Sequence, residues 1–262
     1  MSIGLTPFDH GELCYGWSWT VQDEALLADQ IARVALGQAR HIAKILAGAQ
    51  VGPPQTSAAA AADAVAMLTV VGTDASHRDG WMFQVMSWIA AHRATPGAII
   101  QTPHMILAHK GFDGLQLEVD TESGRVVAAV IFEDKATENP RHMIRDRIWP
   151  EFAKLEAGER ENVLAAGVIA LLERQPAIDV DSAIQNIIWK QARHYRVSVT
   201  VGHTHGDEEG RRRLFKDYDA IAVGAVGRRR GETFLIPELR AWMAQLADRA
   251  IAAVQEAAGA HV

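Results

Sequence analysis

The chain has 262 residues but a single cysteine, Cys14, and it lacks an apolar run of membrane-spanning length. One thiol cannot form an internal disulfide, which is typical of proteins that fold in a reducing compartment. A transmembrane helix needs about 20 successive apolar residues, so we expect no membrane span. The first ten residues contain neither the basic nor the apolar segment of a secretory signal. We therefore expect a cytoplasmic protein.

An excess of positive charge is also missing. The sequence has 26 Lys and Arg against 32 Asp and Glu, a net charge of −6, which argues against a basic coat that binds nucleic acid without selectivity. A local basic groove stays compatible with this balance, because nucleic-acid binding depends on where the charge lies. The apolar fraction of 48% is ordinary for a globular protein with a sizeable core.

The first part of the chain is predicted to be helical. Residues 1–20 show no clear period, but apolar residues three and four apart predict a helix over 22–48. An Ala-rich stretch predicts a second helix over 57–69. We interpret residues 1–75 as an N-terminal helical segment and 76–262 as the main domain.

The main domain alternates predicted helices and strands. A helix over 81–92 precedes a strand over 111–120 and a strongly apolar strand over 126–135, and a turn joins these two strands. Apolar residues of both parities in the second strand predict that it is covered on both faces. Further helices are predicted over 140–156, 160–174, 181–195 and 237–258, with strands over 196–201 and 218–226. This order predicts an α/β fold with a mixed central sheet.

Three charged residues stand at the ends of the two paired strands. Asp113 begins the first strand, and Glu133 and Lys135 end the second. Side chains alternate along a strand, so Glu133 and Lys135 share a face. A short hairpin brings Asp113 close to Glu133. Carboxylate oxygens suit Mg²⁺, which lowers the pKa of a bound water and stabilises charge on a phosphodiester.

This pattern resembles the catalytic core of the PD-(D/E)xK nuclease superfamily. Gly111-Phe-Asp113-Gly followed by Val130-Ile-Phe-Glu133-Asp-Lys135 is similar to the family's acid, short hairpin and (D/E)-x-K at the end of an apolar strand. The resemblance implies a restriction-endonuclease-like αβββα core with extra helices. It also implies hydrolysis of DNA with Mg²⁺ or Mn²⁺, held by Asp113 and Glu133, while Lys135 serves the attacking water.

The resemblance extends to accessory residues. Some family members have an acid on the helix before the first strand, where this chain has Gln84. Gln191-x-x-x-Tyr195 resembles a motif of the RecB-like branch, although it lies farther after the lysine than in that branch. Arg141 and Arg145 are four residues apart on the helix after the hairpin, so we interpret them as phosphate contacts.

Compact proteins with this core often act in restriction or antiphage defence, so the resemblance implies one of these settings. More narrowly, the core motif is similar to the small nuclease subunit of Hachiman-type antiphage systems, which works with a helicase. The resemblance therefore implies DNA as a partner, together with a helicase or another defence protein. A homo-oligomer stays open.

Three other interpretations of the sequence stay open. Glu133 and Lys135 could form a surface ion pair, with Asp113 a turn residue. The chain could be a catalytically inactive nucleic-acid or protein-binding module on the same fold. It could also be a small-molecule metallohydrolase that uses the loop of His203 and His205.

Overall fold

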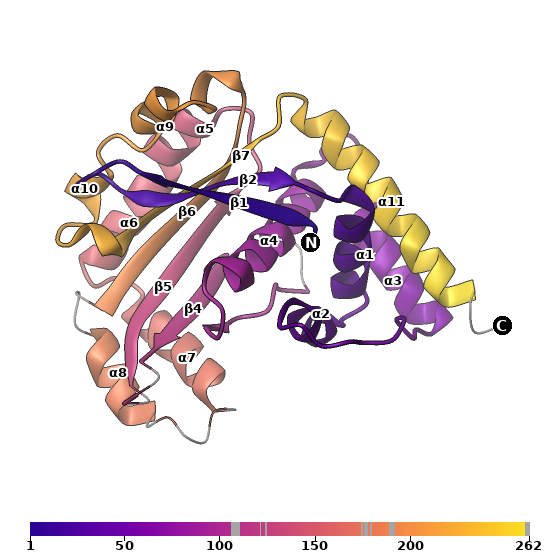
Figure 1. Ribbon diagram of the computed structural model, residues 1–262, viewed down its shortest axis with the longest axis horizontal. Coiled ribbons are helices and arrows are strands. Elements are labelled where there is room, and N and C mark those ends of the chain that lie inside the picture. Colours follow the sequence, from indigo (N-terminus) through magenta and orange to yellow (C-terminus); the bar gives the residue numbers. More distant parts are fainter. Residues whose placement is uncertain are drawn as a thin grey trace.

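The computed structural model describes residues 1–105, 111–120, 122–123, 125–173, 175, 178, 180–188 and 192–259. Within these ranges the fold is mixed α/β and is built around a seven-stranded sheet (Figure 1). The strands lie in the order β1-β2-β7-β6-β5-β4-β3. Their bounds are β1 Ile3–Asp9, β2 Tyr15–Val21, β3 Ile99–Ile100, β4 Gly114–Val119, β5 Val126–Lys135, β6 Arg193–Val201 and β7 Arg229–Leu235.

The sheet is mixed because antiparallel pairs flank a parallel centre. β2, β7, β6 and β5 run parallel to one another. β1 pairs antiparallel with β2 at one side, and β4 pairs antiparallel with β5 and β3 at the other. This confirms the predicted mixed central sheet. Because β5, β6 and β7 are parallel, their carboxyl ends meet at one edge, where Lys135 ends β5.

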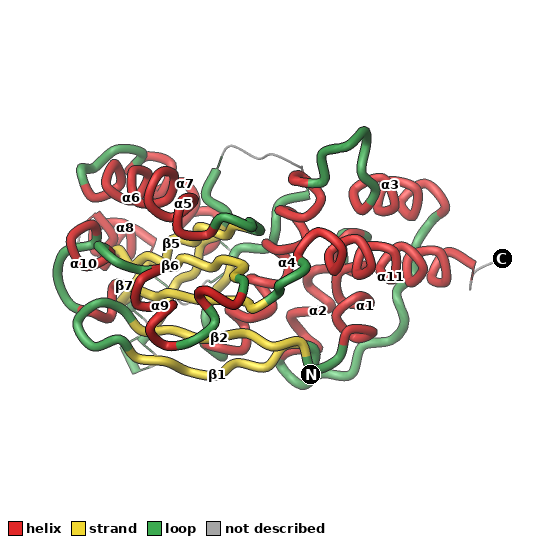
Figure 2. Tube along the Cα trace, turned by 90° about the horizontal axis from the view of Figure 1, so that it is seen from above, coloured by secondary structure: helices red, strands yellow, loops and turns green. Residues whose placement is uncertain are grey.

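Helices pack against both faces of the sheet. Figures 1 and 2 show α1, α3 and α11 side by side at one end of the molecule, beyond α4. The bounds of these helices and of the neighbouring α2 are α1 Glu24–Ala35, α2 Ala39–Leu46, α3 Ala58–Leu68, α4 Ser76–Ala94 and α11 Leu239–Gly259. The remaining helical elements are α5 Pro140–Met143, a π-helical turn Ile144–Ile148, α6 Trp149–Glu156, α7 Glu161–Leu172, α8 Val180–Ile188, α9 Glu208–Leu214 and α10 Tyr218–Ile221.

The two largest buried apolar clusters join these layers. In the first, the ring of Trp19 on β2 lies 5.5 Å from Phe83 on α4 and 6.2 Å from Phe234 on β7. In the second, Phe152 on α6 packs 4.6 Å from Tyr195 on β6. Within the described ranges, no helix is both long and apolar enough to cross a bilayer.

Most predicted elements are confirmed with small shifts. The apolar strand is β5 at its predicted bounds, and the strand before it is β4. The helix predicted over 22–48 is divided into α1 and α2 at Gly37, whose φ of 75° leaves the helical region. The helix predicted over 81–92 is α4, which begins five residues earlier.

Three predictions are wrong. Residues 1–75 are predicted to be a helical segment, but residues 3–21 form the β1–β2 hairpin, which joins the main sheet through β7. The helix predicted to reach residue 195 ends at Ile188, and Arg193 begins β6. Residues 218–221 are helical, and the strand lies later, at Arg229–Leu235. We did not predict β7 as a strand because most of its side chains are polar. In the structure these polar side chains are buried and have partners inside the protein. The division of the chain at residues 75 and 76 stays a prediction.

The contact between β2 and β7 requires glycine. Gly16 lies opposite Gly231 in the parallel register. A Cβ built on Gly16 would lie 1.6 Å from the carbonyl oxygen of Gly231. No side chain fits into this space, so the two backbones can approach only without one. This approach attaches the N-terminal hairpin to the rest of the sheet.

Gly16→Ala is expected to lower the free energy of unfolding by at least about 2 kcal/mol, because β2 and β7 must separate to admit the methyl group. Denaturant unfolding followed by circular dichroism measures the change. Gly52→Ala is the control, since nothing lies within 4 Å of its added Cβ. Equal stability of the two variants would contradict this account of the β2–β7 contact.

Candidate functional site

The structure brings Asp113, Glu133 and Lys135 together at the end of β5. Gly114 pairs with Phe132, so Asp113 lies beside Glu133 across the hairpin. The ammonium nitrogen of Lys135 lies 2.7 Å from Oδ2 of Asp113 and 2.7 Å from Oε1 of Glu133. The predicted convergence of two carboxylates and one ammonium group is therefore present in the fold.

Asp113 is held at both carboxylate oxygens. Its Oδ1 accepts a hydrogen bond from Nε2 of Gln84 on α4, at 2.7 Å. Its Oδ2 accepts one from the backbone N–H of Asp134 at 2.9 Å, in addition to that from Lys135. The predicted accessory residue Gln84 thus reaches the cluster, and it does so as a donor to Asp113.

The three side chains are partly buried. The exposed fractions are 14% for Asp113, 20% for Glu133 and 27% for Lys135. Ion pairs that are fully solvated contribute little, whereas charges at this depth interact more strongly and need partners. The cluster is therefore not an exposed surface ion pair of the kind that the sequence left open.

When both are ionised, the two carboxylates of the cluster outnumber its single ammonium group. Burial raises the pKa of Glu133 to about 7, and repulsion from Asp113 adds to this, while Lys135 opposes it. Glu151, in the first turn of α6, contributes a smaller repulsion. Burial alone would lower the pKa of Lys135, but the two carboxylates outweigh it and raise this pKa above its usual value. Lys135 therefore stays an ammonium group at neutral pH.

The two arginines predicted to contact phosphate have different surroundings. Arg141 donates to the carbonyl oxygens of Leu214 and Lys216 at 3.0 and 2.9 Å, and to Asp217 at 3.1 Å. It therefore fastens α5 to the chain after α9. Arg145 is 59% exposed on the π-helical turn and pairs with Asp146. Of the two, Arg145 is the one whose side chain faces solvent.

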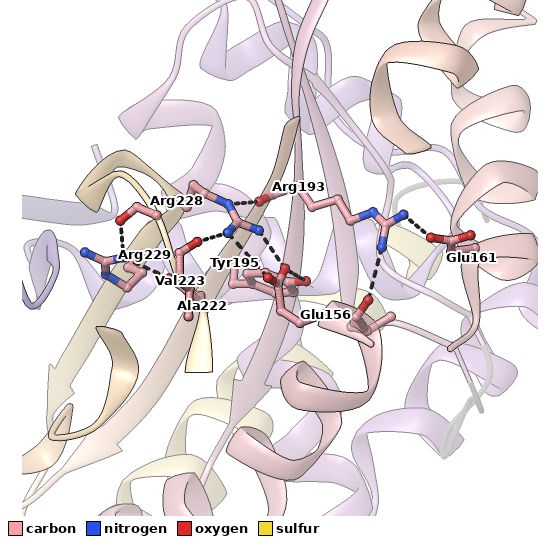
Figure 3. Close-up of polar contacts among 10 residues, drawn as sticks. Glu156, Glu161, Arg193, Tyr195, Ala222, Val223, Arg228 and Arg229 are labelled. Carbon is pink, nitrogen blue, oxygen red and sulfur yellow. Dashed lines mark hydrogen bonds and ion pairs between the residues drawn. The ribbon is translucent and has the colours of Figure 1, made fainter. Parts of the chain in front are cut away.

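Tyr195, the described residue of the RecB-like motif, does not join the cluster. Gln191 lies outside the described residues. Tyr195 is fully buried and pairs with Ile131, two residues before Glu133 along β5. Its hydroxyl donates to Glu156 at 2.6 Å, and its pKa is raised by burial and by this bond. Tyr195 therefore belongs to the packing of α6 on the sheet (Figure 3).

Arg228–Arg230, the arginine run at the start of β7, also bind groups within the protein. Arg228 binds Glu156 at 2.6 Å and the carbonyl of Arg193 at 2.9 Å (Figure 3). Arg229 donates to the carbonyls of residues 12, 13, 222 and 224. A cavity of about 590 Å³ lies beside this network and is lined by Glu156, His194, Ile221, Val223, Gly224, Ala225, Gly227 and Arg228. The run of arginines thus stabilises the loop before β7 and does not form an open basic groove.

The histidine loop shows no metal-binding arrangement. His203–His205 is a 3-10 turn, and Nδ1 of His205 lies 3.0 Å from the carbonyl oxygen of Gly210. Among the residues that the structure describes, no group of three or more His, Cys, Asp or Glu side chains is placed to hold a metal ion. Asp113 and Glu133 provide two carboxylates, so other ligands of a cation there would be water or substrate.

Sequence analysis did not predict the buried hydrogen bonds that lie behind the cluster. Ser87 on α4 donates to Asp134 at 2.7 Å, and Arg196 on β6 donates to Ser87 at 2.7 Å. One signal was available, since Ser87 follows Gln84 by three residues and so lies on the same helix face. Nothing in the sequence showed that the charged Arg196 is buried beneath that helix.

Lys135→Met is expected to lower the free energy of unfolding by about 1–3 kcal/mol at pH 8, because it leaves two partly buried carboxylates without their cation. Adding Glu133→Gln should recover part of the loss, and urea unfolding of the single and double variants measures both effects. Lys154→Met is the control, since Lys154 forms an exposed pair with Glu151. A loss as small as that of the control would contradict the proposed coupling.

Comparison of the chain with protein-family models, with curated proteins and with solved structures finds no match. A function must therefore be inferred from the chemistry of the described residues. The cluster of Asp113, Glu133 and Lys135 is the arrangement that carries most chemistry.

Proposed function

We propose that the protein is a Mg²⁺-dependent nuclease that hydrolyses DNA phosphodiester bonds at the Asp113–Glu133–Lys135 cluster. The observation that carries the proposal is that both carboxylates contact one cationic nitrogen, each at 2.7 Å. Side chains that share one cation in this way are close enough to hold a small divalent ion between them. Their oxygen atoms are the ligands that Mg²⁺ prefers.

The charge of the site supports a bound cation. Asp113 and Glu133 together carry two negative charges when ionised, and Lys135 offsets one of them. The raised pKa of Glu133 reflects its burial first and then the repulsion from Asp113. When bound, a divalent ion would lower the pKa of a coordinated water and stabilise charge on the phosphate. Manganese fits the same ligands.

The three side chains would have separate roles. Asp113 and Glu133 would hold the ion through their carboxylates. Lys135 remains protonated, so it would donate a hydrogen bond to the attacking water or to a phosphoryl oxygen rather than accept a proton. For this, its Nζ would turn from the carboxylates towards the substrate, as the ion takes over their charge.

The order of elements is compatible with the finer fold that we propose. Helix α4 precedes the three strands β3, β4 and β5, and helices α5 and α6 follow them. This is the αβββα order of the restriction-endonuclease-like core. The same resemblance is the basis for proposing restriction or antiphage defence as the setting. A helicase or another defence protein is the partner that it implies.

A catalytically inactive module on the same fold is the alternative. Gln84, rather than an acid, contacts Asp113, and Lys135 occupies the space between the carboxylates. Such a cluster could be purely structural. Cleavage experiments separate the two functions.

Purified protein is expected to nick supercoiled plasmid in Mg²⁺ or Mn²⁺ and to lose this activity in EDTA. Glu133→Ala and Lys135→Ala should each reduce the cleavage rate by roughly 100-fold or more, because each removes a group that binds the ion or stabilises the transition state. Agarose gel electrophoresis measures the rate.

Glu209→Ala and Arg213→Ala are the controls, since these residues form an exposed pair on α9. They should cleave at the wild-type rate. Cleavage that persists in Glu133→Ala and Lys135→Ala, with both variants folded, would refute the proposal, because the activity would then not come from the cluster.

A further inference from the structure

The residue between Glu133 and Lys135 is a buried acid. Asp134 is 3% exposed and points to the opposite face of β5, towards α4. Carboxylates are rarely buried so completely without a specific partner. Its Oδ1 accepts a hydrogen bond from the hydroxyl of Ser87 at 2.7 Å. The side chain of Asp134 is thus fastened to α4.

Ser87 is in turn fastened to the centre of the sheet. Its hydroxyl oxygen accepts a hydrogen bond from Nη1 of Arg196 at 2.7 Å. Arg196 is fully buried and donates to both carboxylate oxygens of Glu232, at 2.7 and 2.6 Å. The indole N–H of Trp19 donates to Glu232 at 2.7 Å. A continuous chain of hydrogen bonds therefore connects Asp134 to β6, β7 and β2.

Helix α4 controls the position of Asp113 by two routes. Gln84 donates directly to Oδ1 of Asp113. One turn later, Ser87 holds the side chain of Asp134, whose backbone N–H donates to Oδ2 of Asp113 at 2.9 Å. The second route passes through the peptide that lies between Glu133 and Lys135.

We propose that Ser87 and Asp134 are positioning residues of the Asp113–Glu133–Lys135 cluster, an inference that rests on the proposed nuclease function. Side chains alternate along a strand, so holding Asp134 against α4 directs its two neighbours to the other face. The same restraint aims the N–H that fixes Asp113. Hydrogen bonds behind functional side chains commonly have this effect on metal affinity and rate.

The test compares variants that keep or remove the acceptor at position 134. Ser87→Ala and Asp134→Val are expected to lower kcat for an oligonucleotide duplex in Mg²⁺ by roughly 10- to 100-fold, with KM unchanged. Asp134→Asn keeps an oxygen that can accept from Ser87, so it should retain a kcat close to that of the wild type. Combining Ser87→Ala with Asp134→Val should reduce kcat no further than either change alone, because both remove the same hydrogen bond between Ser87 and Asp134.

Ser2→Ala is the control, since it removes a buried hydroxyl whose side-chain partner, Gln30, is not part of the cluster. It should leave kcat unchanged even if it lowers stability. If Asp134→Val does not fold, Ser87→Ala decides the outcome.

Each failure has its own signature. Wild-type kcat in Ser87→Ala, with Glu133→Ala inactive, would overturn the positioning role and leave the nuclease function intact. An equal loss in Asp134→Asn and Asp134→Val would also overturn it, because charge would then matter instead of the hydrogen bond. Absence of cleavage by the wild type would overturn both the function and the positioning role.

Discussion

A fully buried ion pair at the centre of the sheet connects three strands to helix α4, which contacts the site. Arg196 on β6 and Glu232 on β7 are 0% and 1% exposed at their side chains, and two N–H groups of the arginine meet the two carboxylate oxygens. Removing one partner of such a pair leaves an uncompensated buried charge, which costs about 3–5 kcal/mol. Glu232 also accepts a hydrogen bond from Trp19 on β2, and Arg196 donates one to Ser87 on α4. The ion pair therefore connects three strands and one helix.

In the Asp113–Glu133–Lys135 cluster, by contrast, positive and negative charges are not equal in number. Two carboxylates share one ammonium group in partial burial, and Glu133 responds with a raised pKa. A site of this kind is held in place by its surroundings, because its own charges repel one another in part. The rigid partners on α4 and in the peptide of Asp134 supply that restraint. The ion pair at the sheet centre and the cluster at the end of β5 are thus parts of one hydrogen-bonded arrangement.

Several of the positively charged side chains are buried and bind acceptors within the protein. Arg193, Arg196 and Arg228–Arg230 are all buried and bind carboxylates or carbonyl oxygens. These arginines are therefore not available to line an open basic groove, although the chain has 26 basic residues. Arg145 keeps an exposed guanidinium near the helices that follow the cluster.

The sequence by itself determined the cluster and the strands that carry it. A hairpin is a local structure, so the alternation of side chains and a short turn were enough to place Asp113 beside Glu133 and Lys135. The sequence could not determine the β1–β2 hairpin or β7 as parts of the sheet, because β2 and β7 pair across more than 200 residues and β7 is polar. Only the tertiary structure decided that its arginines and Glu232 are buried, since a charged strand becomes buried only where distant partners neutralise it. For the same reason the sequence indicated no partner for Asp134, and only the packing of α4 against β5 supplied one, Ser87.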